Sequence, residues 1–318
     1  MVMRMISFIG KRLLLAVPTI VLVTFLVFLL MELSPTDPAA TLAGDNPTPE
    51  RLAEIRAALG LDRPFWERYL DWGAAALHGD FGVSPITHQA VTSDLMFRLP
   101  ITVSLVVLAL FFAVVMGVVL GTVAALNRGG AVDWAMNAIA NILLAVPPFV
   151  AAILLVLFFA ILSPAFPATG YATLSDGIGP WLQFSTLPAL SLATIPGALL
   201  ARQVRSALVD TLEEDYIRTA RAKGLRRGAI VAKHAAKNAA PPVVTVLGLV
   251  LTSMIGGAVV VEKIFAIPGL GSVSVDSVLN GDLVTLQGLI VVVALVVTAV
   301  NLAVDASYGY FNPRLRAR

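Results

Sequence analysis

Residues 101–126 read ITVSLVVLALFFAVVMGVVLGTVAAL, a run without a single Asp, Glu, Lys or Arg. A helix needs about 20 apolar residues to cross the hydrocarbon core of a bilayer, so this run is long enough to span one. Lipid offers the backbone no hydrogen-bond partners, and a continuous apolar run of this length is therefore expected to be helical. The sequence predicts a membrane protein built from α-helices.

The composition of the whole chain supports this prediction. Of its 318 residues 58% are hydrophobic and 13% are charged, whereas an average soluble chain is about 45–50% apolar. Six spans are expected, at about Leu13–Met31, Ile101–Leu126, Trp134–Leu162, Thr186–Leu208, Val243–Phe265 and Val284–Val304. The first is expected to be retained, because no cleavage site of the A-x-A kind follows it. The fold class is all-α, a polytopic membrane protein with six transmembrane helices.

The distribution of positive charge predicts the orientation. With the N-terminus inside, the cytoplasmic segments hold 16 of the 22 Lys and Arg residues, and nine of these lie between Arg202 and Lys237. The outer segments hold the other six, five of them in one long loop. Cytoplasmic loops of membrane proteins carry the excess of Lys and Arg, so both termini are predicted to be cytoplasmic.

The long outer segment, from about Leu33 to Pro100, is predicted to carry short amphipathic helices on the membrane surface. Thr48 before Pro49 is typical of a helix N-cap with proline at the first helical position, and Gly60 occupies the place of a C-terminal capping glycine. The following stretch carries the aromatic residues Phe65, Trp66, Tyr69 and Trp72, of a kind that prefers the bilayer interface.

Several spans contain prolines or closely spaced glycines, such as Pro147-Pro148 and the pair Gly117 and Gly121. These patterns predict kinked and closely packed helices. Charged groups deep in the spans look scarce, with Arg202 and Asp305 near span ends. Transporters driven by ion gradients usually need intramembrane carboxylates, so this scarcity weakens that class.

Most catalytic chemistry is excluded by the residues themselves. The chain has no cysteine, and it has no G-x-x-x-x-G-K-[ST] phosphate loop. Its three histidines, His78, His88 and His234, are scattered and form no metal-ligand spacing. We therefore expect no catalytic residue, no metal site and no cofactor bound by this chain, and no role in binding nucleic acid.

The loop between the fourth and fifth expected spans carries the most informative pattern, EEDYIRTARAKG at residues 213–224. Acids precede bases, which complements a helix dipole, and Gly224 can adopt the left-handed conformation that ends a helix. Ile217, Ala220 and Gly224 share one face, where the two small residues would let another protein approach closely. A solvated basic loop is the alternative interpretation, which the residues alone leave open.

This loop resembles the cytoplasmic signature of the permease subunits of ABC importers, a Glu-Ala-Ala-x-x-x-Gly pattern whose helix docks into the ATPase. Arg218 and Thr219 stand in place of its first two residues. The resulting motif, RTARAKG at residues 218–224, is typical of the oligopeptide, dipeptide and nickel branch. The resemblance to the B-type permease of that branch extends along nearly the whole chain. Its segments are SPTDP (34–38), LGLDRP (59–64), GDFG (79–82), RLPIT (98–102), EKIFAIPGLG (262–271) and YFNPR (310–314), with departures at Thr36 and Asn312.

The resemblance implies the type I ABC-importer permease architecture in a bacterial inner membrane. It divides the chain into residues 1–97, a first helix with an extracytoplasmic segment, residues 98–307, the transmembrane core with a coupling loop at 209–240, and a cytoplasmic tail at 308–318. The residues expected to couple to the ATPase are Tyr216, Ile217, Arg218, Thr219, Ala220, Arg221, Ala222, Lys223 and Gly224.

The implied function is half of a translocation path for peptides or similar small solutes. The implied partners are a homologous second permease subunit, one or two ATP-binding subunits that use ATP and magnesium, an extracytoplasmic substrate-binding protein and the lipid bilayer. Two other classes stay open, a gradient-driven secondary transporter and a non-transporting membrane receptor or scaffold. A secondary transporter would take up its substrate without an ATPase partner, and a receptor or scaffold would show no flux. Identifying the proteins that co-purify with the chain distinguishes these classes from an ATP-driven importer.

Overall fold

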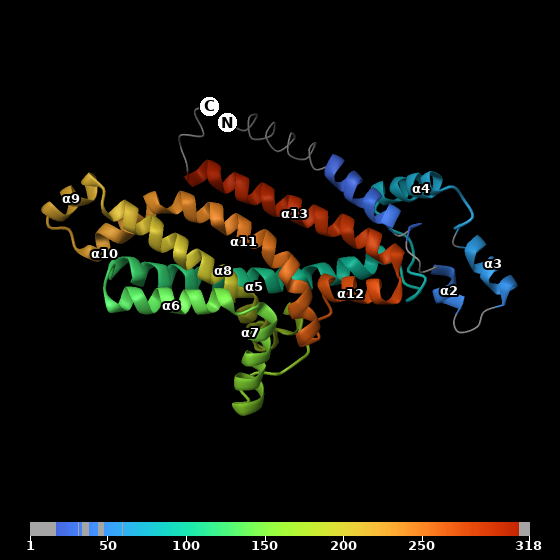
Figure 1. Cartoon of the computed structure of the whole chain (residues 1–318), viewed down its shortest axis with the longest axis horizontal. Coiled ribbons are helices and arrows are strands. Elements are labelled where there is room, and N and C mark those ends of the chain that lie inside the picture. Colours follow the sequence, from blue (N-terminus) through green and yellow to red (C-terminus); the bar gives the residue numbers. More distant parts are fainter. Residues whose placement is uncertain (1–16, 31, 34–37, 44–47, 59, 312–318) are drawn as a thin grey trace. The chain divides into compact units, whose positions relative to one another are not determined.

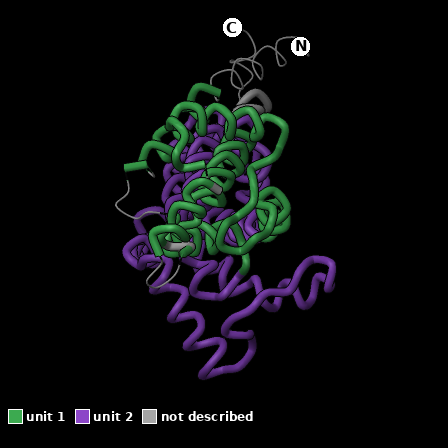
Figure 2. The backbone as a smooth tube through the Cα atoms, turned by 90° about the vertical axis from the view of Figure 1, so that its right-hand side faces the viewer, with its two compact units in different colours: residues 1–101, 268–299 green, residues 102–267, 300–318 purple. Residues whose placement is uncertain are grey.

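The computed structural model describes residues 17–30, 32–33, 38–43, 48–58 and 60–311, and their regular structure is helical (Figure 1). One isolated antiparallel bridge joins Val83 to Ala90. The chain divides into two compact units, residues 1–101 with 268–299 and residues 102–267 with 300–318 (Figure 2). Residues 1–16, Thr36 and Asn312, on which some of the expectations above depend, lie outside the described ranges.

A first helix at Val17–Leu30 precedes the other elements, which follow in chain order. They are α2 (Pro38–Ala43), α3 (Pro49–Ala58), α4 (Phe65–Leu77), α5 (Val91–Leu126), α6 (Ala131–Ala145), α7 (Pro148–Val156), the π-helical turn η1 (Leu157–Leu162), the 3-10 turn η2 (Leu174–Asp176), α8 (Ile178–Leu212), α9 (Asp215–Ala222), α10 (Arg227–Ala229), the π-helical turn η3 (Ile230–Ala235), α11 (Ala236–Phe265), α12 (Leu270–Asn280) and α13 (Leu283–Phe311).

Four continuous helical segments among the described residues are long and apolar enough to cross a membrane. They are Val91–Leu126, Ile178–Leu212, Arg227–Phe265 and Leu283–Val304. A fifth candidate span is broken: Ala131–Ala145 and Pro148–Leu162 meet at 101°. Proline disfavours the α conformation in the residue before it, so Pro147-Pro148 explains the break. The first helix is shorter than these where it is described, and the six-span count stays a prediction.

α8 packs closely against α5 in the second unit, as the glycine spacing predicted. A Cβ atom added to Gly121 would lie 2.5 Å from the carbonyl oxygen of Ala201, and one added to Gly117 would lie 2.5 Å from the Cβ of Leu200. Small residues at such positions let helix backbones approach each other within lipid. Much of α8 is buried, prolines 188 and 196 included, because it also packs against α6, α7 and α11.

Two buried carboxylates lie near the ends of spans and were not predicted. Glu262, in the last turn of α11, is fully buried, and its Oε1 accepts a hydrogen bond of 2.6 Å from the hydroxyl of Thr102. Asp133, in the first turn of α6, is 6% exposed. Both side chains are hydrogen-bonded to other helices of the same unit, which is how a carboxylate is accommodated away from water.

The segment predicted to lie outside contains the helices α3 and α4, and α3 has the ends that the sequence predicted. The predicted amphipathic character is clear in α4 and weak in α3, and their place on the membrane surface stays a prediction. The amide of Arg51 donates to the hydroxyl of Thr48, the N-cap. Gly60 has φ +65°. Its amide donates a hydrogen bond to the carbonyl of Ala57, and the amide of Leu61 donates one to the carbonyl of Arg56. This pattern is a Schellman motif, in which a left-handed glycine satisfies the last carbonyls of a helix.

The aromatic residues of α4 make contacts within the first unit, and their place at the bilayer interface stays a prediction. Phe65 and Tyr69 contact the rings of Phe25 and Phe28 on the first helix, edge to face, with centroids 5.2–5.6 Å apart. Trp66 alone of this group is largely exposed, at 64%. Phe65 and Tyr69 therefore attach α4 to the first helix, while Trp72 contacts the ring of Tyr69 at a centroid distance of 6.2 Å.

Candidate functional site

The candidate site is α9, the two-turn helix formed by the acid-to-base segment that the sequence singled out. Asp215 lies in its first turn and Arg221 in its last, so both charges oppose the partial charges of the helix ends. Its eight residues extend about 12 Å at 1.5 Å per residue. The predicted helix is thus present between α8 and α10.

Gly224 ends this helix as predicted. Its φ is +77°, its amide donates to the carbonyl of Arg221 at 2.9 Å, and the amide of Leu225 donates to that of Ala220 at 3.3 Å. These two bonds again form a Schellman motif. A Cβ added to Gly224 would meet nothing within 4 Å, so the backbone conformation, and no lack of space within the chain, requires glycine here.

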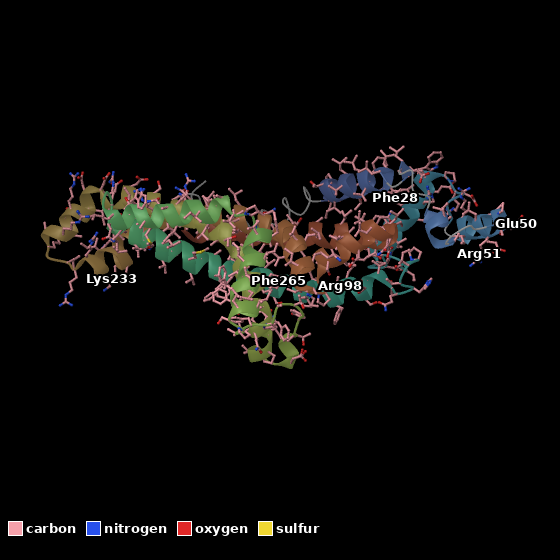
Figure 3. The ribbon with its side chains drawn as sticks, turned by 60° about the horizontal axis from the view of Figure 1, so that its bottom comes forward. Phe28, Glu50, Arg51, Arg98, Lys233 and Phe265 are labelled. Atoms are coloured by element: carbon pink, nitrogen blue, oxygen red, sulfur yellow. The ribbon has the colours of Figure 1, made fainter. Side chains whose placement is uncertain are left out.

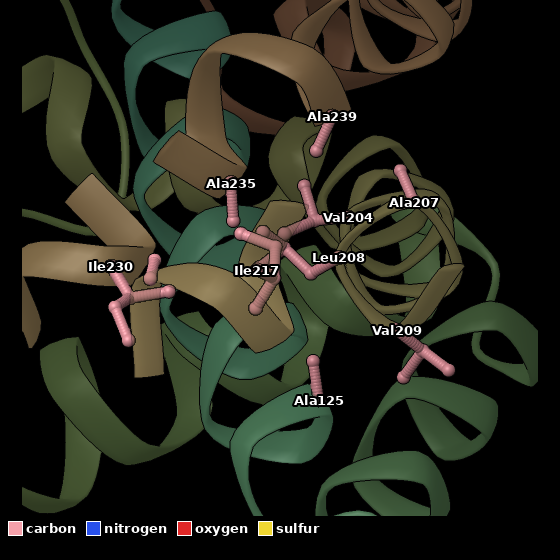
Figure 4. Packing of buried hydrophobic residues seen from close by; sticks show 10 residues of the cluster. Ala125, Val204, Ala207, Leu208, Val209, Ile217, Ile230, Ala235 and Ala239 are labelled. Carbon is pink, nitrogen blue, oxygen red and sulfur yellow. The ribbon is translucent and has the colours of Figure 1, made fainter. Parts of the chain in front are cut away.

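One face of α9 is buried in the chain's own core. Ile217 is fully buried and Ala220 is 7% exposed. Figure 4 shows Ile217 among side chains of α8 and of the segment that leads into α11. The cluster consists of Ala125, Val204, Ala207, Leu208, Val209, Ile217, Ala220, Ile230, Ala235 and Ala239. Burying an isoleucine side chain is worth about 1.5–3 kcal/mol, so Ile217 anchors the helix.

This burial corrects the expectation that Ala220 offers a close approach to a partner protein. Successive helical residues turn by about 100°, so Thr219 and Ala222 lie on the side opposite Ile217 and Ala220. Both are exposed. We call Thr219 and Ala222 the outward face of α9. Its short side chains leave a helix backbone that another protein can approach closely.

The two flanks of α9 carry longer side chains. On one flank the hydroxyl of Tyr216 accepts a hydrogen bond of 2.7 Å from the side-chain amide of Asn238. On the other, Arg218 pairs with Asp215 at 3.2 Å, and Arg221 donates to the carbonyl of Leu212 at 3.3 Å. Figure 3 shows the nitrogen-tipped side chains that gather at this end of the unit, around Lys233.

A groove of about 640 Å³ lies beside the flank that carries Arg218 and Arg221. It is lined by Ala125, Leu126, Arg128, Val209, Leu212, Glu213, Arg218, Arg221, Leu225, Arg227 and Ile230. Arg128 pairs with Glu213, and Arg227 donates to the carbonyl of Leu126. Four arginines therefore face a single carboxylate in the lining.

A second set of contacts connects this region to the broken span. The guanidinium of Arg205, on α8, holds the carboxylate of Asp133 on α6 through two hydrogen bonds of 2.6 and 2.7 Å. The amide of Gly129 and the side chain of Asn137 donate to the same carboxylate. This pair was not predicted, because nothing in the sequence pattern connects residues 72 positions apart.

Within the described part of the chain, no group of three or more His, Cys, Asp or Glu side chains is placed to hold a metal ion. Of the residues predicted to couple, Ile217 and Ala220 are buried and the others are exposed. The structure thus separates the predicted set into the anchoring residues Ile217 and Ala220 and a group of exposed residues that includes the outward face.

Comparisons with known proteins cover almost the whole chain. Residues 117–317 match the family described as "Binding-protein-dependent transport system inner membrane component", and residues 5–106 match the family of its N-terminal part. A protein of Sinorhizobium fredii named "Probable peptide ABC transporter permease protein" is 38% identical over 97% of this chain and 99% of its own. The "Dipeptide transport system permease protein" of Escherichia coli is 36% identical over 98% of this chain and 99% of its own.

Solved structures share the fold at lower identity. A chain of a methionine ABC transporter in an inward-facing conformation aligns with a TM-score of 0.57 at 19% identity, over 69% of this chain and 96% of that chain. A second crystal form of the same transporter gives 0.54 at 19% identity, over 67% and 93%. These alignments show that the type I permease architecture predicted from the sequence is present.

Proposed function

Because this chain belongs to the family of binding-protein-dependent inner-membrane transport components, and is thus a multi-pass permease subunit of an ATP-driven importer, we propose that it forms half of a translocation path for peptides. The cargo is proposed from the relatives, whose names specify peptides or dipeptides. The other half of the path is a homologous second permease subunit. An extracytoplasmic binding protein delivers the cargo to the outer segments.

The observation that carries the proposal is the two-faced character of α9. Ile217 and Ala220 anchor it to the side chains of α8 and α5, while Thr219 and Ala222 remain exposed. A helix anchored in this way cannot move alone, so a displacement imposed on its outward face is transmitted to the spans. Such transmission is required if conformational changes of a separate ATPase are to open and close the translocation path.

That motor is a separate ATPase whose surface groove receives the outward face of α9. The chain carries no G-x-x-x-x-G-K-[ST] loop, so ATP and magnesium are held by the partner subunits. When nucleotide binding brings the two ATPase subunits together, the surface groove of each ATPase moves the α9 helix that is bound in it. The ion pair of Asp133 with Arg205 transmits the displacement of α8 to α6, the first half of the broken span.

α9 must face the cytoplasm for this mechanism to operate. The excess of Lys and Arg in the segment from Arg202 to Lys237 supports that orientation and places both termini inside as well. The loop that contains η2 then lies outside.

Reconstituted transport tests the function. Proteoliposomes would contain the chain, its second permease and its ATPases, with binding protein and labelled dipeptides and tripeptides added outside. We expect uptake that requires both ATP inside and the binding protein. Uptake driven by a proton or sodium gradient without ATP would indicate a secondary transporter. Flux under neither condition would indicate a receptor or scaffold.

A further inference from the structure

We propose that the groove beside α9 is a binding site for the headgroup of an anionic phospholipid. The groove is lined by Arg128, Arg218, Arg221 and Arg227 against the single carboxylate of Glu213. Its lining therefore carries three net positive charges, without counting the exposed Asp215 that pairs with Arg218. Its volume of about 640 Å³ falls in the range of small-ligand sites.

Apolar side chains make up the rest of the lining. They are Ala125, Leu126, Val209, Leu212, Leu225 and Ile230. Leu126 and Leu212 are the last residues of α5 and α8, two helices long and apolar enough to span a membrane. The groove thus lies at the ends of two candidate spans, and our proposal places these ends in the headgroup region of the bilayer. A lining that combines apolar residues with arginines suits a phospholipid, which has both an anionic head and acyl chains.

Two arginines are held in place by the helix ends themselves. Arg227 donates to the carbonyl of Leu126, the last residue of α5, and Arg221 donates to that of Leu212, the last residue of α8. A guanidinium has five N–H donors, so it can hold a carbonyl and a phosphate oxygen at once. Arginine is also the side chain best suited to bind a phosphate through two hydrogen bonds.

The groove and the outward face of α9 are adjacent, because Arg218 in the groove lining lies one helical turn before Ala222. Arg218 and Arg221 line the groove, whereas Thr219 and Ala222 are the residues proposed to meet the ATPase. Neither Thr219 nor Ala222 belongs to the groove lining, so a bound lipid would lie beside the proposed ATPase contact and would not cover it. The lipid proposal rests on the proposed function only for placing the groove in the cytoplasmic leaflet.

The test measures lipid retention by the purified complete transporter. Native mass spectrometry would count phosphatidylglycerol and phosphatidylcholine molecules retained from an equimolar mixture. We expect the wild type to prefer phosphatidylglycerol, and the double variant Arg128→Gln/Arg227→Gln to lose about tenfold of that preference. The matched control Lys233→Gln/Lys237→Gln removes the same charge from residues outside the groove lining and should keep the preference.

A second variant tests the proposal even if the double arginine variant fails to fold. Leu225, 42% exposed at the groove, can be changed to Glu or to Gln without removing an arginine or a helix-end contact. Leu225→Glu should weaken phosphatidylglycerol retention, and Leu225→Gln should leave it nearly unchanged. Equal loss in the lysine control, or retention unaffected by Leu225→Glu, would overturn the proposal.

Two further arms separate the lipid from other anions. Millimolar inorganic phosphate or glycerol phosphate should not displace the bound lipid; displacement would identify a site for small anions instead. A photo-crosslinker at Leu225 should label phospholipid, and labelling of the ATPase alone would make the groove a protein interface. ATP-coupled uptake is measured separately, so a failure of the proposed function would not be mistaken for a failure of lipid binding.

Discussion

The carboxylate of Asp133 and the guanidinium of Arg205 form a two-bond ion pair, with Oδ1 2.6 Å from Nε and Oδ2 2.7 Å from Nη2. The pair joins the first turn of α6 to α8. Asp133 is 6% exposed and the side chain of Arg205 is 30% exposed. The carboxylate also accepts bonds from Gly129 and Asn137, so its environment is built for a negative charge.

Removing either member of this pair should destabilise the permease. Asp133→Ala leaves a partly buried guanidinium without its carboxylate, and we expect a loss of about 3 kcal/mol in the free energy of unfolding. Arg205→Ala should cost less, because Gly129 and Asn137 still donate to the carboxylate. Unfolding by a denaturing detergent, followed by tryptophan fluorescence, measures both. The double variant should lose less than the sum of the single losses, and strict additivity would contradict a direct interaction.

A charge swap at these positions should fail to restore stability. In Asp133→Arg/Arg205→Asp the ion pair could form again, but the Gly129 amide and the Asn137 amide would then face a cation. Stability equal to the wild type would mean that the ion pair alone matters and that the two amide donors contribute nothing.

The backbone at Gly224 predicts a graded response to substitution. Its φ of +77° suits Asn far better than Val, while the space around it accepts either side chain. Gly224→Asn should keep transport close to wild type, and Gly224→Val should strain the turn by about 1–2 kcal/mol and reduce coupled uptake. Parallel measurements of uptake and of protein level in the membrane check this. Equal transport by the two variants would exclude the left-handed turn as the reason for the glycine.

Much of the fold could be predicted from the sequence, because lipid imposes helices on long apolar runs. The five later spans correspond to helices or to the broken pair. The glycine pair at 117 and 121 predicted close helix packing, although it did not identify α8 as the neighbouring helix. Helix ends were predicted less well. α5 begins ten residues before the expected span, at Val91, because its first turns carry charges that hydropathy excludes. α12 was not predicted at all.

The sequence predicted which residues form the site, but it did not predict which of their side chains are exposed. The charge order and Gly224 predicted a short helix with the correct end, whereas the side on which it packs depends on residues distant in sequence. Ala235 and Leu208, which cover Ile217, are 18 and nine residues away from it on either side. Ala220 was therefore assigned to the partner when it belongs to the core. The buried Glu262 and the pair of Asp133 with Arg205 depend on tertiary contacts in the same way.

Two alanines of α9 provide a matched pair for the outward face. Ala220 is buried against the core and Ala222 is exposed, two residues away. Ala220→Trp should overpack the core and lower the amount of folded protein. Ala222→Trp should leave the permease folded, while ATP-coupled uptake falls at least tenfold because the bulky ring obstructs the ATPase groove. Normal uptake by a well-expressed Ala222→Trp variant would contradict the assigned face.

The orientation can be checked with single cysteines, since the natural chain has none. Gly179, at the start of α8, and Gly228, in α10, are both exposed, and a Cβ at either position meets nothing within 4 Å. In intact cells an impermeant thiol reagent should label Gly179→Cys and spare Gly228→Cys. After the membrane is opened, both should react. Labelling of Gly228→Cys in intact cells would reverse the proposed topology.

The central claim is that α9 meets an ATPase through Thr219 and Ala222. A photo-crosslinking amino acid placed at Ala222 in the complete transporter tests it most directly, with the same amino acid at Gly179 as the control. On irradiation we predict a crosslink between the permease and the ATPase subunit from position 222 and none from position 179. If a transporter that still couples ATP hydrolysis to uptake gives no ATPase crosslink from position 222, the coupling role of α9 is wrong.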